Sequence, residues 1–501
     1  MTDTVGGLLD SAVDEHADRP ALLWQGAELA YAELRQQVVV LAKRLERSAG
    51  PAGLVGQRIA IIAPNSPALA VATFAAWRVG AVAVPLTARL REWELERILG
   101  DAEPTAVVCV ASHGGYSFAE ALERLSPGLP TLRSCLLAGP AGEVEDERRS
   151  GATRVSEPLA AEVAALLYSS GTTGAPRGAL VSHAREVNGA RAFRDLLELK
   201  ADDRAVLIVP ISHAFGLTCF LATLAAGAAV VLVESTFSPG PLLRALEERR
   251  PTLLHGSPTL FASLLGSRPE ALDGIRSGLV AGAPSPSAML ERLAAHGLLA
   301  LNVYGLTEAG AVSSCRLDDP PAVRLTTVGR ALPGFELRVA NDGVLELRGP
   351  AVTPGYFGRS APDVDAFVDG WFRTGDLATI EGGYVRIVGR AKDVVQVGGF
   401  TVVPAEVEAV LLEHPDVLEA AVLGRPSERM GEVLEAFVVA RPGAVLTSID
   451  LLRFARSRVA GYKVPYALRM LPSLPVLASG KPDRRRLRNL AAAGSAGSDD
   501  V

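Results

Sequence analysis

Hydrophobic and polar positions along the chain form blocks that predict strands and helices in turn. The segments 58–64 ("RIAIIAP"), 80–86 ("GAVAVPL") and 105–110 ("TAVVCV") are short and apolar, which is typical of buried strands. Between them, the Ala-rich segment 67–79 and the segment 91–102 have the length and composition of helices. Strands that alternate with helices predict a largely parallel sheet with both faces covered.

This pattern recurs over 205–281 and changes from about residue 328 onward. There, shorter strands such as 335–340 ("FELRVA") and 343–349 ("GVLELRG") are bounded by Gly and Pro turns, which favours antiparallel pairing. A smaller unit follows "VRIVGRAKD", and we predict for it the order helix, strand, strand, helix over 404–413, 419–424, 435–440 and 448–459.

The predicted fold class is therefore α/β. A large N-terminal domain of parallel sheets covered by helices, with a small β-barrel-like part, precedes a small α+β C-terminal domain. We expect the N-terminal domain to span 1–389 and the C-terminal domain 390–490. The remaining residues, 491–501 ("AAAGSAGSDDV"), are expected to be a disordered tail, because chain ends of small and polar residues are commonly disordered.

One apolar stretch is long enough to suggest a membrane helix. Residues 215–233 ("FGLTCFLATLAAGAAVVLV") carry no charge. However, Gly227 interrupts the stretch, the β-branched "AAVVLV" follows, and no basic residues flank it closely. We therefore predict a buried helix, a turn and a buried strand, and no membrane span.

Composition narrows the classes of function. The chain is 49% hydrophobic and 21% charged, as globular proteins are, and its net charge of −6 gives no electrostatic reason to expect nucleic acid as a partner. Its four cysteines form no CxxC pair, which argues against a zinc site or a disulfide framework and suits a reducing compartment. The N-terminus is acidic where a signal peptide would be basic, so we expect a cytoplasmic protein.

A loop rich in small residues is the first candidate for chemistry. Residues 166–180 ("LLYSSGTTGAPRGAL") combine a strand end with hydroxyls, glycines and one cation, Arg177. Backbone N–H groups and hydroxyls presented in this way bind phosphate oxygens. The loop does not fit the Walker A pattern, and on its own it is equally compatible with a flexible surface loop.

A second segment strengthens the nucleotide interpretation. Residues 303–310 ("VYGLTEAG") place an aromatic ring, a hydroxyl and a carboxylate close together. Tyr304 would stack on a purine, Thr307 would bond a phosphate and Glu308 would bind Mg²⁺. Any one of these residues alone would more often be an ordinary packing or surface residue.

Both segments belong to a set of motifs that runs through the chain in a single order. The set is "YSSGTTGAPRG", "PISHAFG" (210–216), "AGAP" (281–284), "YGLTE" (304–308), "WFRTGDLA" (371–378), "GRAKDVVQVGGFTVVPAEVE" (389–408) and "SGKPDRRRLR" (479–488). With these motifs the chain resembles the adenylate-forming superfamily, which includes acyl- and aryl-CoA synthetases, adenylation domains of peptide synthetases and beetle luciferases. The resemblance implies that a carboxylate attacks the α-phosphate of ATP, giving an acyl-adenylate and pyrophosphate, and that a thiol then displaces AMP.

The resemblance assigns a nucleotide site residue by residue. The loop that holds the β- and γ-phosphates matches Ser169, Ser170, Gly171, Thr172, Thr173 and Gly174. A wall of the adenine site matches Gly282, Ala283 and Pro284. Tyr304 matches the stacking face of that site, Asp376 the acid that accepts both ribose hydroxyls, and Arg390 a second ribose contact. Arg177 stands where the family usually has lysine, and we expect phosphate binding to survive because the charge is kept.

The same resemblance assigns catalytic roles. Thr307 matches a phosphate ligand and Glu308 the Mg²⁺ carboxylate. Lys481 matches the lysine that reaches the α-phosphate and the attacking carboxylate. Lys392 matches the hinge about which the C-terminal domain moves as a lid, and Gly399 a glycine beside the pantetheine tunnel.

The substrate pocket points to an acid without an α-amine. Amino-acid activators carry an Asp that pairs with the substrate amine, and Ala214 stands at that position. His213 matches the pocket floor of relatives that activate acyl and aryl acids, with a packing role as the alternative. Gly310 and Ala311 border the pocket and, being small, are expected to leave room. A fatty acid and an aromatic acid both fit this description.

The acceptor of the acyl group is left open by these residues. The expected cofactors are ATP, Mg²⁺ and coenzyme A, and the expected partner is a small-molecule carboxylic acid. Alternatively, the thiol is the phosphopantetheine of an acyl carrier protein, or the acceptor is an amine or another nucleophile. A luciferase-like oxygenase shares the motifs without any feature here that favours it. A non-catalytic nucleotide-binding protein is disfavoured by Glu308, Asp376 and Lys481 together.

Overall fold

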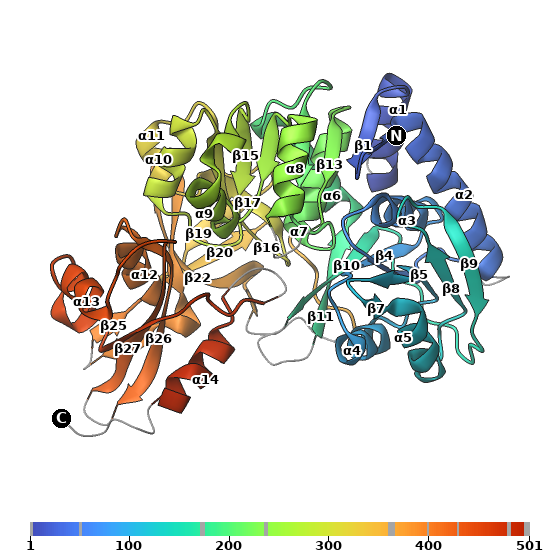
Figure 1. Ribbon diagram of the computed structural model, residues 1–501. Coiled ribbons are helices and arrows are strands. Elements are labelled where there is room, and N and C mark those ends of the chain that lie inside the picture. The colour runs from blue at the N-terminus through green and yellow to red at the C-terminus, as the bar shows by residue number, and fades with distance from the viewer. Residues whose placement is uncertain are drawn as a thin grey trace.

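Two mostly parallel sheets form the larger part of the molecule (Figure 1). The computed structural model describes residues 4–49, 53–170, 176–234, 239–358, 366–397, 400–427, 430–477 and 482–494. The first sheet has the strand order β11-β10-β4-β3-β5-β8-β9. Its strands are β3 (Arg58–Ala63), β4 (Val82–Thr87), β5 (Ala106–Val110), β8 (Ser134–Ala138), β9 (Val144–Arg149), β10 (Val163–Ser170) and β11 (Pro176–Ser182).

The second sheet has the order β18-β17-β16-β15-β14-β12-β13-β1-β2. From β16 to β1 neighbouring strands run parallel, and the antiparallel pairs lie at the two edges. The strands are β1 (Pro20–Trp24), β2 (Ala27–Ala30), β12 (Arg204–Leu207), β13 (Ala229–Leu232), β14 (Leu253–His255), β15 (Ser277–Val280), β16 (Leu299–Leu306), β17 (Gly310–Ser314) and β18 (Arg330–Ala331). The predicted parallel α/β organisation is confirmed.

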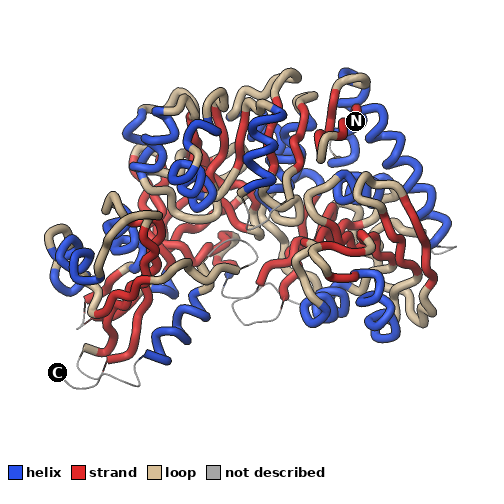
Figure 2. Tube along the Cα trace, in the orientation of Figure 1, coloured by secondary structure: helices blue, strands red, loops and turns tan. Residues whose placement is uncertain are grey.

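Helices lie around the strands of both sheets (Figure 2). They are α1 (Val5–His16), α2 (Tyr31–Ala49), α3 (Pro67–Arg78), α4 (Glu92–Ala102), α5 (Phe118–Leu125), α6 (His183–Leu196), α7 (Ala214–Ala225), α8 (Gly240–Arg249), α9 (Pro258–Ser267), α10 (Ser287–Ala295) and α11 (Pro321–Thr326). Phe74 of α3 and Phe220 of α7 meet with ring centroids 5.9 Å apart. Because α3 packs on the first sheet and α7 on the second, one continuous core joins the two sheets.

The apolar stretch 215–233 forms the buried helix, turn and strand that we predicted. Helix α7 is followed by Gly227, whose φ of +69° suits a glycine, and then by β13. Within the described ranges, none of the helices combines the length and apolar character needed to cross a bilayer.

An antiparallel sheet follows, as expected from the change of pattern. It contains β19 (Glu336–Val339), β20 (Val344–Arg348), β21 (Phe367–Val368), β22 (Trp371–Glu381) and β23 (Tyr384–Arg390). All of its strand pairs are antiparallel. The sheet packs beside β16 and β17, where Tyr304, Val312 and Phe372 share a small apolar cluster.

The C-terminal part has a sheet and a core of its own and lies at one end of the molecule (Figure 1). Its strands are β24 (Val395–Val397), β25 (Phe400–Val402), β26 (Val417–Ser427), β27 (Gly431–Ala440) and β28 (Ala467–Met470), and its helices are α12 (Pro404–Leu412), α13 (Ser448–Arg456) and α14 (Arg484–Gly494). The fold class of a large parallel-sheet domain followed by a small α+β domain is confirmed, whereas the boundary at residue 390 stays a prediction.

The predicted tail is wrong in its first four residues, since α14 continues to Gly494. Ala491 is buried beside Leu487 against the β26–β27 strand pair. Arg469 also donates hydrogen bonds to the backbone carbonyls of Leu490 and Ala491. Packing and these capping bonds extend the helix into a segment whose composition alone did not require order.

Candidate active site

The candidate residues collect where parallel strands end. Ser169 and Ser170 are the last residues of β10, and Tyr304 lies near the end of β16. The segment 282–284 follows β15 and is exposed, and His213 directly precedes α7 after β12. Ligands in open α/β sheets bind outside the carboxyl ends of the strands, so this edge is the expected place for a nucleotide.

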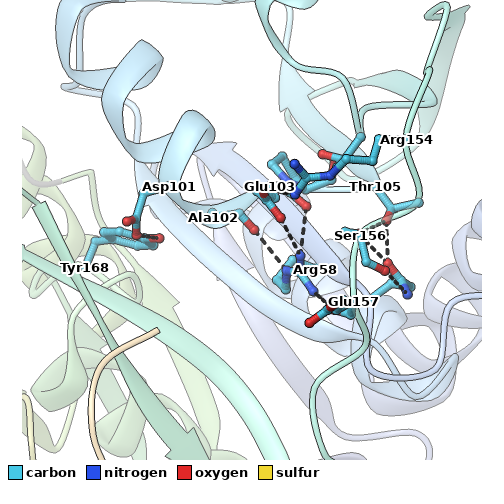
Figure 3. A network of polar contacts seen from close by, with 12 residues as sticks. Arg58, Asp101, Ala102, Glu103, Thr105, Arg154, Ser156, Glu157 and Tyr168 are labelled. Carbon is cyan, nitrogen blue, oxygen red and sulfur yellow. Dashed lines mark hydrogen bonds and ion pairs between the residues drawn. The ribbon is translucent and has the colours of Figure 1, made fainter. Parts of the chain in front are cut away.

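The end of β10 is held by a polar network in the first sheet (Figure 3). The Tyr168 hydroxyl donates to Asp101 at 2.5 Å, and the ring of Tyr168 leaves no space for a Cβ at Gly178 on β11. Deeper in the sheet, Arg58 is 1% exposed and donates to the carbonyls of Ala102, at 2.9 Å, and of Glu157. The Tyr168–Asp101 bond therefore links the end of β10 to α4, and Arg58 links β3 to the end of α4 and to the segment before β10.

Part of the predicted site lies outside the described residues. The backbone of Ser169 and Ser170 belongs to β10, whereas their side chains are not described. Six further predicted site residues lie wholly outside the described ranges: Gly171, Thr172, Thr173, Gly174, Gly399 and Lys481. Their assigned roles stay predictions.

Glu308 meets a tyrosine that the sequence did not point to. The hydroxyl of Tyr356 donates to Glu308 Oε1 at 2.5 Å. The guanidinium of Arg177 lies over the Tyr356 ring, 5.6 Å from its centroid. Burial raises the pKa of Tyr356, and the nearby Glu308 carboxylate raises it further. The phenol therefore stays a hydrogen-bond donor at neutral pH, between a carboxylate and a cation.

The backbone around Tyr356 joins this cluster to β11. Phe357 N–H donates to Gly178 O at 2.8 Å, and the Thr353 hydroxyl donates to Leu180 O at 2.8 Å. The Thr353 N–H donates to the carbonyl of Glu308 at 2.6 Å. The segment 353–357 thus connects the strand that carries Arg177 with the turn that carries Glu308.

A buried arginine holds the other side of the same turn. Arg185 of α6 is 4% exposed, and its Nη1 donates to Thr307 O at 2.8 Å. Gly310 has a φ of +72°, and a Cβ there would come within 3.0 Å of Arg185 Nε. The space beside Gly310 that we expected to be left for the substrate is therefore partly taken by Arg185.

Asp376 and Tyr304 meet across two sheets. The Tyr304 hydroxyl donates to Asp376 Oδ2 at 2.6 Å, and Arg390 Nε lies 2.9 Å from Asp376 Oδ1. Asp376 and Arg390 are paired across β22 and β23, so the register itself brings them together. Burial, followed by the Asp376 charge, raises the pKa of Tyr304. This is a carboxylate held in place by one neutral and one charged donor, beside an aromatic ring.

The loop before α7 is positioned by a buried asparagine, Asn65. Its Nδ2 donates to Val209 O at 2.9 Å and to Leu207 O at 3.2 Å, and its Oδ1 accepts from Ile211 N–H at 3.0 Å. Asn65 follows β3, so it ties the strand ends of the two sheets together beside His213. No motif in the sequence identifies this residue, because its partners lie more than a hundred positions away.

The predicted hinge residue Lys392 is exposed on a short 3₁₀ turn, Ala391–Asp393, directly after β23. Asp393 beside it lies 3.8 Å from Arg484 and 3.8 Å from Arg488 of α14. Arg484 also donates to Glu408 of α12 at 2.9 Å. The turn is therefore linked by charge to the helix that follows the candidate catalytic segment.

The described residues show no group of three or more His, Cys, Asp and Glu side chains that could hold a metal ion. Mg²⁺ at nucleotide sites usually takes one or two carboxylates together with phosphate oxygens and water. Glu308, fixed by Tyr356 and by its own backbone, fits this kind of site as a protein ligand.

The chain matches the family model "AMP-binding enzyme" over residues 9–357 and the model "AMP-binding enzyme C-terminal domain" over residues 406–481. A feruloyl-CoA synthase of Amycolatopsis sp is 36% identical over 477 residues, which cover 91% of this chain and 92% of that protein. A 3-[(3aS,4S,7aS)-7a-methyl-1,5-dioxo-octahydro-1H-inden-4-yl]propanoyl:CoA ligase of Mycobacterium tuberculosis is 35% identical over 513 residues, which cover 97% of this chain and 99% of that protein. The crystal structure of ATP-bound MatB from Rhodopseudomonas palustris is similar with a TM-score of 0.84 and 30% identity, covering 98% of this chain and 99% of that one.

The fold defines the class as the two-domain adenylate-forming enzymes. The chain belongs to the AMP-binding enzyme family, which both family models and the full-length relatives show. The membership that we predicted from the ordered motifs is confirmed.

Proposed function

We propose that this protein is an ATP-dependent, AMP-forming ligase that joins a fatty or aromatic carboxylic acid to coenzyme A. The observation that carries the proposal is a pair of carboxylates held by hydrogen bonds, Glu308 in the turn between β16 and β17 and Asp376 on β22. Glu308 is held by Tyr356 near the Arg177 cation, and Asp376 is held by Tyr304 and Arg390. The names of these two relatives, a CoA ligase and a CoA synthase, support coenzyme A as the acceptor.

The two carboxylates suit two different tasks. Asp376 accepts hydrogen bonds without donating, which fits a ribose diol, and Arg390 and Tyr304 keep its oxygens oriented. Glu308 would hold Mg²⁺ when the ion is bound, and the ion would supply positive charge at the phosphates. Arg177 adds a permanent cation on the same side. Two anions, the acid and the triphosphate, can be brought together only where such charges are already in place.

The expected acid lacks an α-amine. Ala214 begins α7 beside His213 and offers no carboxylate to an ammonium group. His213 lies in the loop that Asn65 ties to both sheets, so the pocket wall is firmly positioned. We infer a neutral acyl or aryl tail.

The test is pyrophosphate release across a panel of fatty, aromatic and α-amino acids, followed by addition of coenzyme A. We expect the fastest release with acids that lack an α-amine, and stoichiometric AMP and thioester after coenzyme A is added. Parallel reactions with hydroxylamine and with a carrier protein loaded with phosphopantetheine compare the other acceptors. Fastest release with α-amino acids, or an adenylate that coenzyme A does not consume, would contradict the proposal.

A further inference from the structure

The turn between β16 and β17 is held at its backbone from two sides. It consists of residues 307–309, between the last residue of β16 and the first of β17. Arg185 Nη1 donates to the carbonyl of Thr307 at 2.8 Å, and the Thr353 N–H donates to the carbonyl of Glu308 at 2.6 Å. The main chain that carries both candidate ligands is therefore fixed by two groups that are remote in sequence, and one of them is a charged side chain.

The buried charge of Arg185 is balanced by its neighbour on α6. A guanidinium stays protonated in proteins, so Arg185 keeps its charge although it is buried. Arg185 Nε lies 3.4 Å from Glu186 Oε1, and both side chains are almost fully buried. Because an uncompensated buried charge is strongly destabilising, Glu186 is the residue that allows Arg185 to stay at this place.

Glu186 is in turn oriented by α7. The Thr218 hydroxyl lies 3.1 Å from Glu186 Oε2 and 3.0 Å from the carbonyl of Ala214. Thr218 is itself buried. A chain of polar contacts thus runs from α7 through Glu186 and Arg185 to the backbone of Thr307.

A small cavity beside the charged pair suits one water molecule. Its volume is about 20 Å³, and its lining includes Arg185, Glu186 and Thr218. Within the described part of the chain, the buried atoms Arg185 Nη2 and Glu186 Oε1 have no hydrogen-bond partner. A space of this size holds one water and no substrate, and a water there can accept from Nη2 while it donates to Oε1. The water would complete the hydrogen bonding that orients both side chains.

We propose that Glu186 and one buried water orient Arg185, and that this arginine fixes the backbone beside the phosphate-binding hydroxyl of Thr307. Arg185, Glu186 and Thr218 are therefore positioning residues, because they act on the nucleotide through the backbone of the turn. The inference rests on the proposed function, since it concerns the nucleotide site of that ligase.

The experiment measures nucleotide binding and turnover in variants of this network. Calorimetry with Mg²⁺ gives the Kd for α,β-methylene-ATP, an analogue that cannot release pyrophosphate. Pyrophosphate release with the fastest acid of the panel gives kcat, the KM for ATP and the KM for the acid. The variants are Glu186→Gln, which removes the charge, and Thr218→Val, which removes only the hydroxyl and keeps the size of the side chain.

Each variant has a matched control on the same helix. Asp195→Asn removes a carboxylate from α6, but Asp195 is 68% exposed and pairs with Arg194. Thr223→Val changes a second buried threonine of α7, whose hydroxyl donates to Cys219 O at 2.9 Å and so stays within its own helix. The controls show what substitution in these helices does when the contacts of Arg185 are kept.

We expect Glu186→Gln to lower kcat/KM for ATP by about 10- to 100-fold, the scale of a small displacement in a positioned site. Thr218→Val should lower it about 3- to 10-fold, the range for one ordinary hydrogen bond, and it decides the question if Glu186→Gln folds poorly. The KM for ATP and the Kd for the analogue should rise together, while the KM for the acid changes less than about twofold. A purely structural role would instead lower kcat in proportion to the loss of folded protein and leave both KM values unchanged.

Two results would overturn the inference alone. One is an unchanged KM for ATP and an unchanged Kd for the analogue in both variants. The other is an equal rise of these values in Asp195→Asn and Thr223→Val. A crystal structure of the wild type should also show the water between Arg185 Nη2 and Glu186 Oε1, and other partners for these two atoms would refute its part in the network. Absence of pyrophosphate release with every acid would reject the proposed function, whereas the Kd for the analogue would still decide the positioning role.

Discussion

The hydrogen bond from Tyr356 to Glu308 allows a quantitative test of the candidate catalytic centre. Glu308→Gln keeps the shape of the side chain and removes its charge. If this carboxylate holds Mg²⁺ against the triphosphate, adenylation should slow by roughly 10²-fold or more, the scale of one strong electrostatic contact. Tyr356→Phe keeps the ring under Arg177 and removes only the donor to Glu308.

The expected effect of Tyr356→Phe follows from its geometry. At 2.5 Å the bond is a short, charge-assisted one, for which the net contribution is about 1.5–3 kcal/mol. Tyr356 is only half-buried, so we expect the lower end of that range, or roughly tenfold in kcat/KM for ATP. In the double variant the two losses should not add, because both act through the same carboxylate.

The assay is steady-state pyrophosphate release at several Mg²⁺ concentrations, with Tyr384→Phe as the control. Tyr384 donates to Asp319 at 2.7 Å, so its variant removes the same kind of bond outside the site. We expect Tyr356→Phe to raise the Mg²⁺ concentration needed for half-maximal rate, and Tyr384→Phe to leave it unchanged. Near-normal rates with Glu308→Gln would show that another residue binds the metal ion. Additive losses in the double variant would show that Tyr356 does not act through Glu308.

Four further predictions concern single residues. Asp376→Asn should raise the KM for ATP by roughly 10- to 100-fold, since two ribose hydroxyls and Arg390 lose a charged acceptor; an unchanged KM would reject the ribose role. Arg177→Lys should keep most activity whereas Arg177→Ala raises the KM for ATP, and an inactive lysine variant would show that the forked guanidinium is needed. Lys481→Ala should abolish most adenylate formation yet still convert added acyl-adenylate to thioester, which single-turnover measurements of both steps would check. His255 accepts from Leu279 N–H in the core, and burial lowers its pKa to about 4 from a usual 6.5, so the unfolded chain binds the proton first. The free energy of unfolding should therefore fall as pH drops from 6.5 to 4, by up to about 3 kcal/mol more in the wild type than in His255→Asn. Denaturation experiments that give the same pH dependence for both proteins would contradict this.

Local pattern predicted the elements of this protein well because apolar periodicity is a short-range property. The strand at 58–64 and the helix at 404–413 appear as β3 and α12 with small shifts at their ends. The change to short strands near residue 335 correctly indicated antiparallel pairing. The end of α14 could not be predicted in this way, because Ala491 is ordered by partners on β26–β27 and by Arg469 rather than by its neighbours in sequence.

The motifs likewise revealed the family and the candidate carboxylates, since each motif is a continuous run of residues whose chemistry can be recognised locally. The residues that contact those carboxylates could not be recognised from a continuous motif. Tyr356 lies 48 residues from Glu308, and Arg185 lies 122 residues from Thr307. Neither carries a local signal, because a tyrosine after a turn and an arginine on a helix are ordinary in any sequence. Hydrogen bonding and charge act over a few ångströms in space, so which residues complete the site depends on how the two sheets and the segment 353–357 pack together.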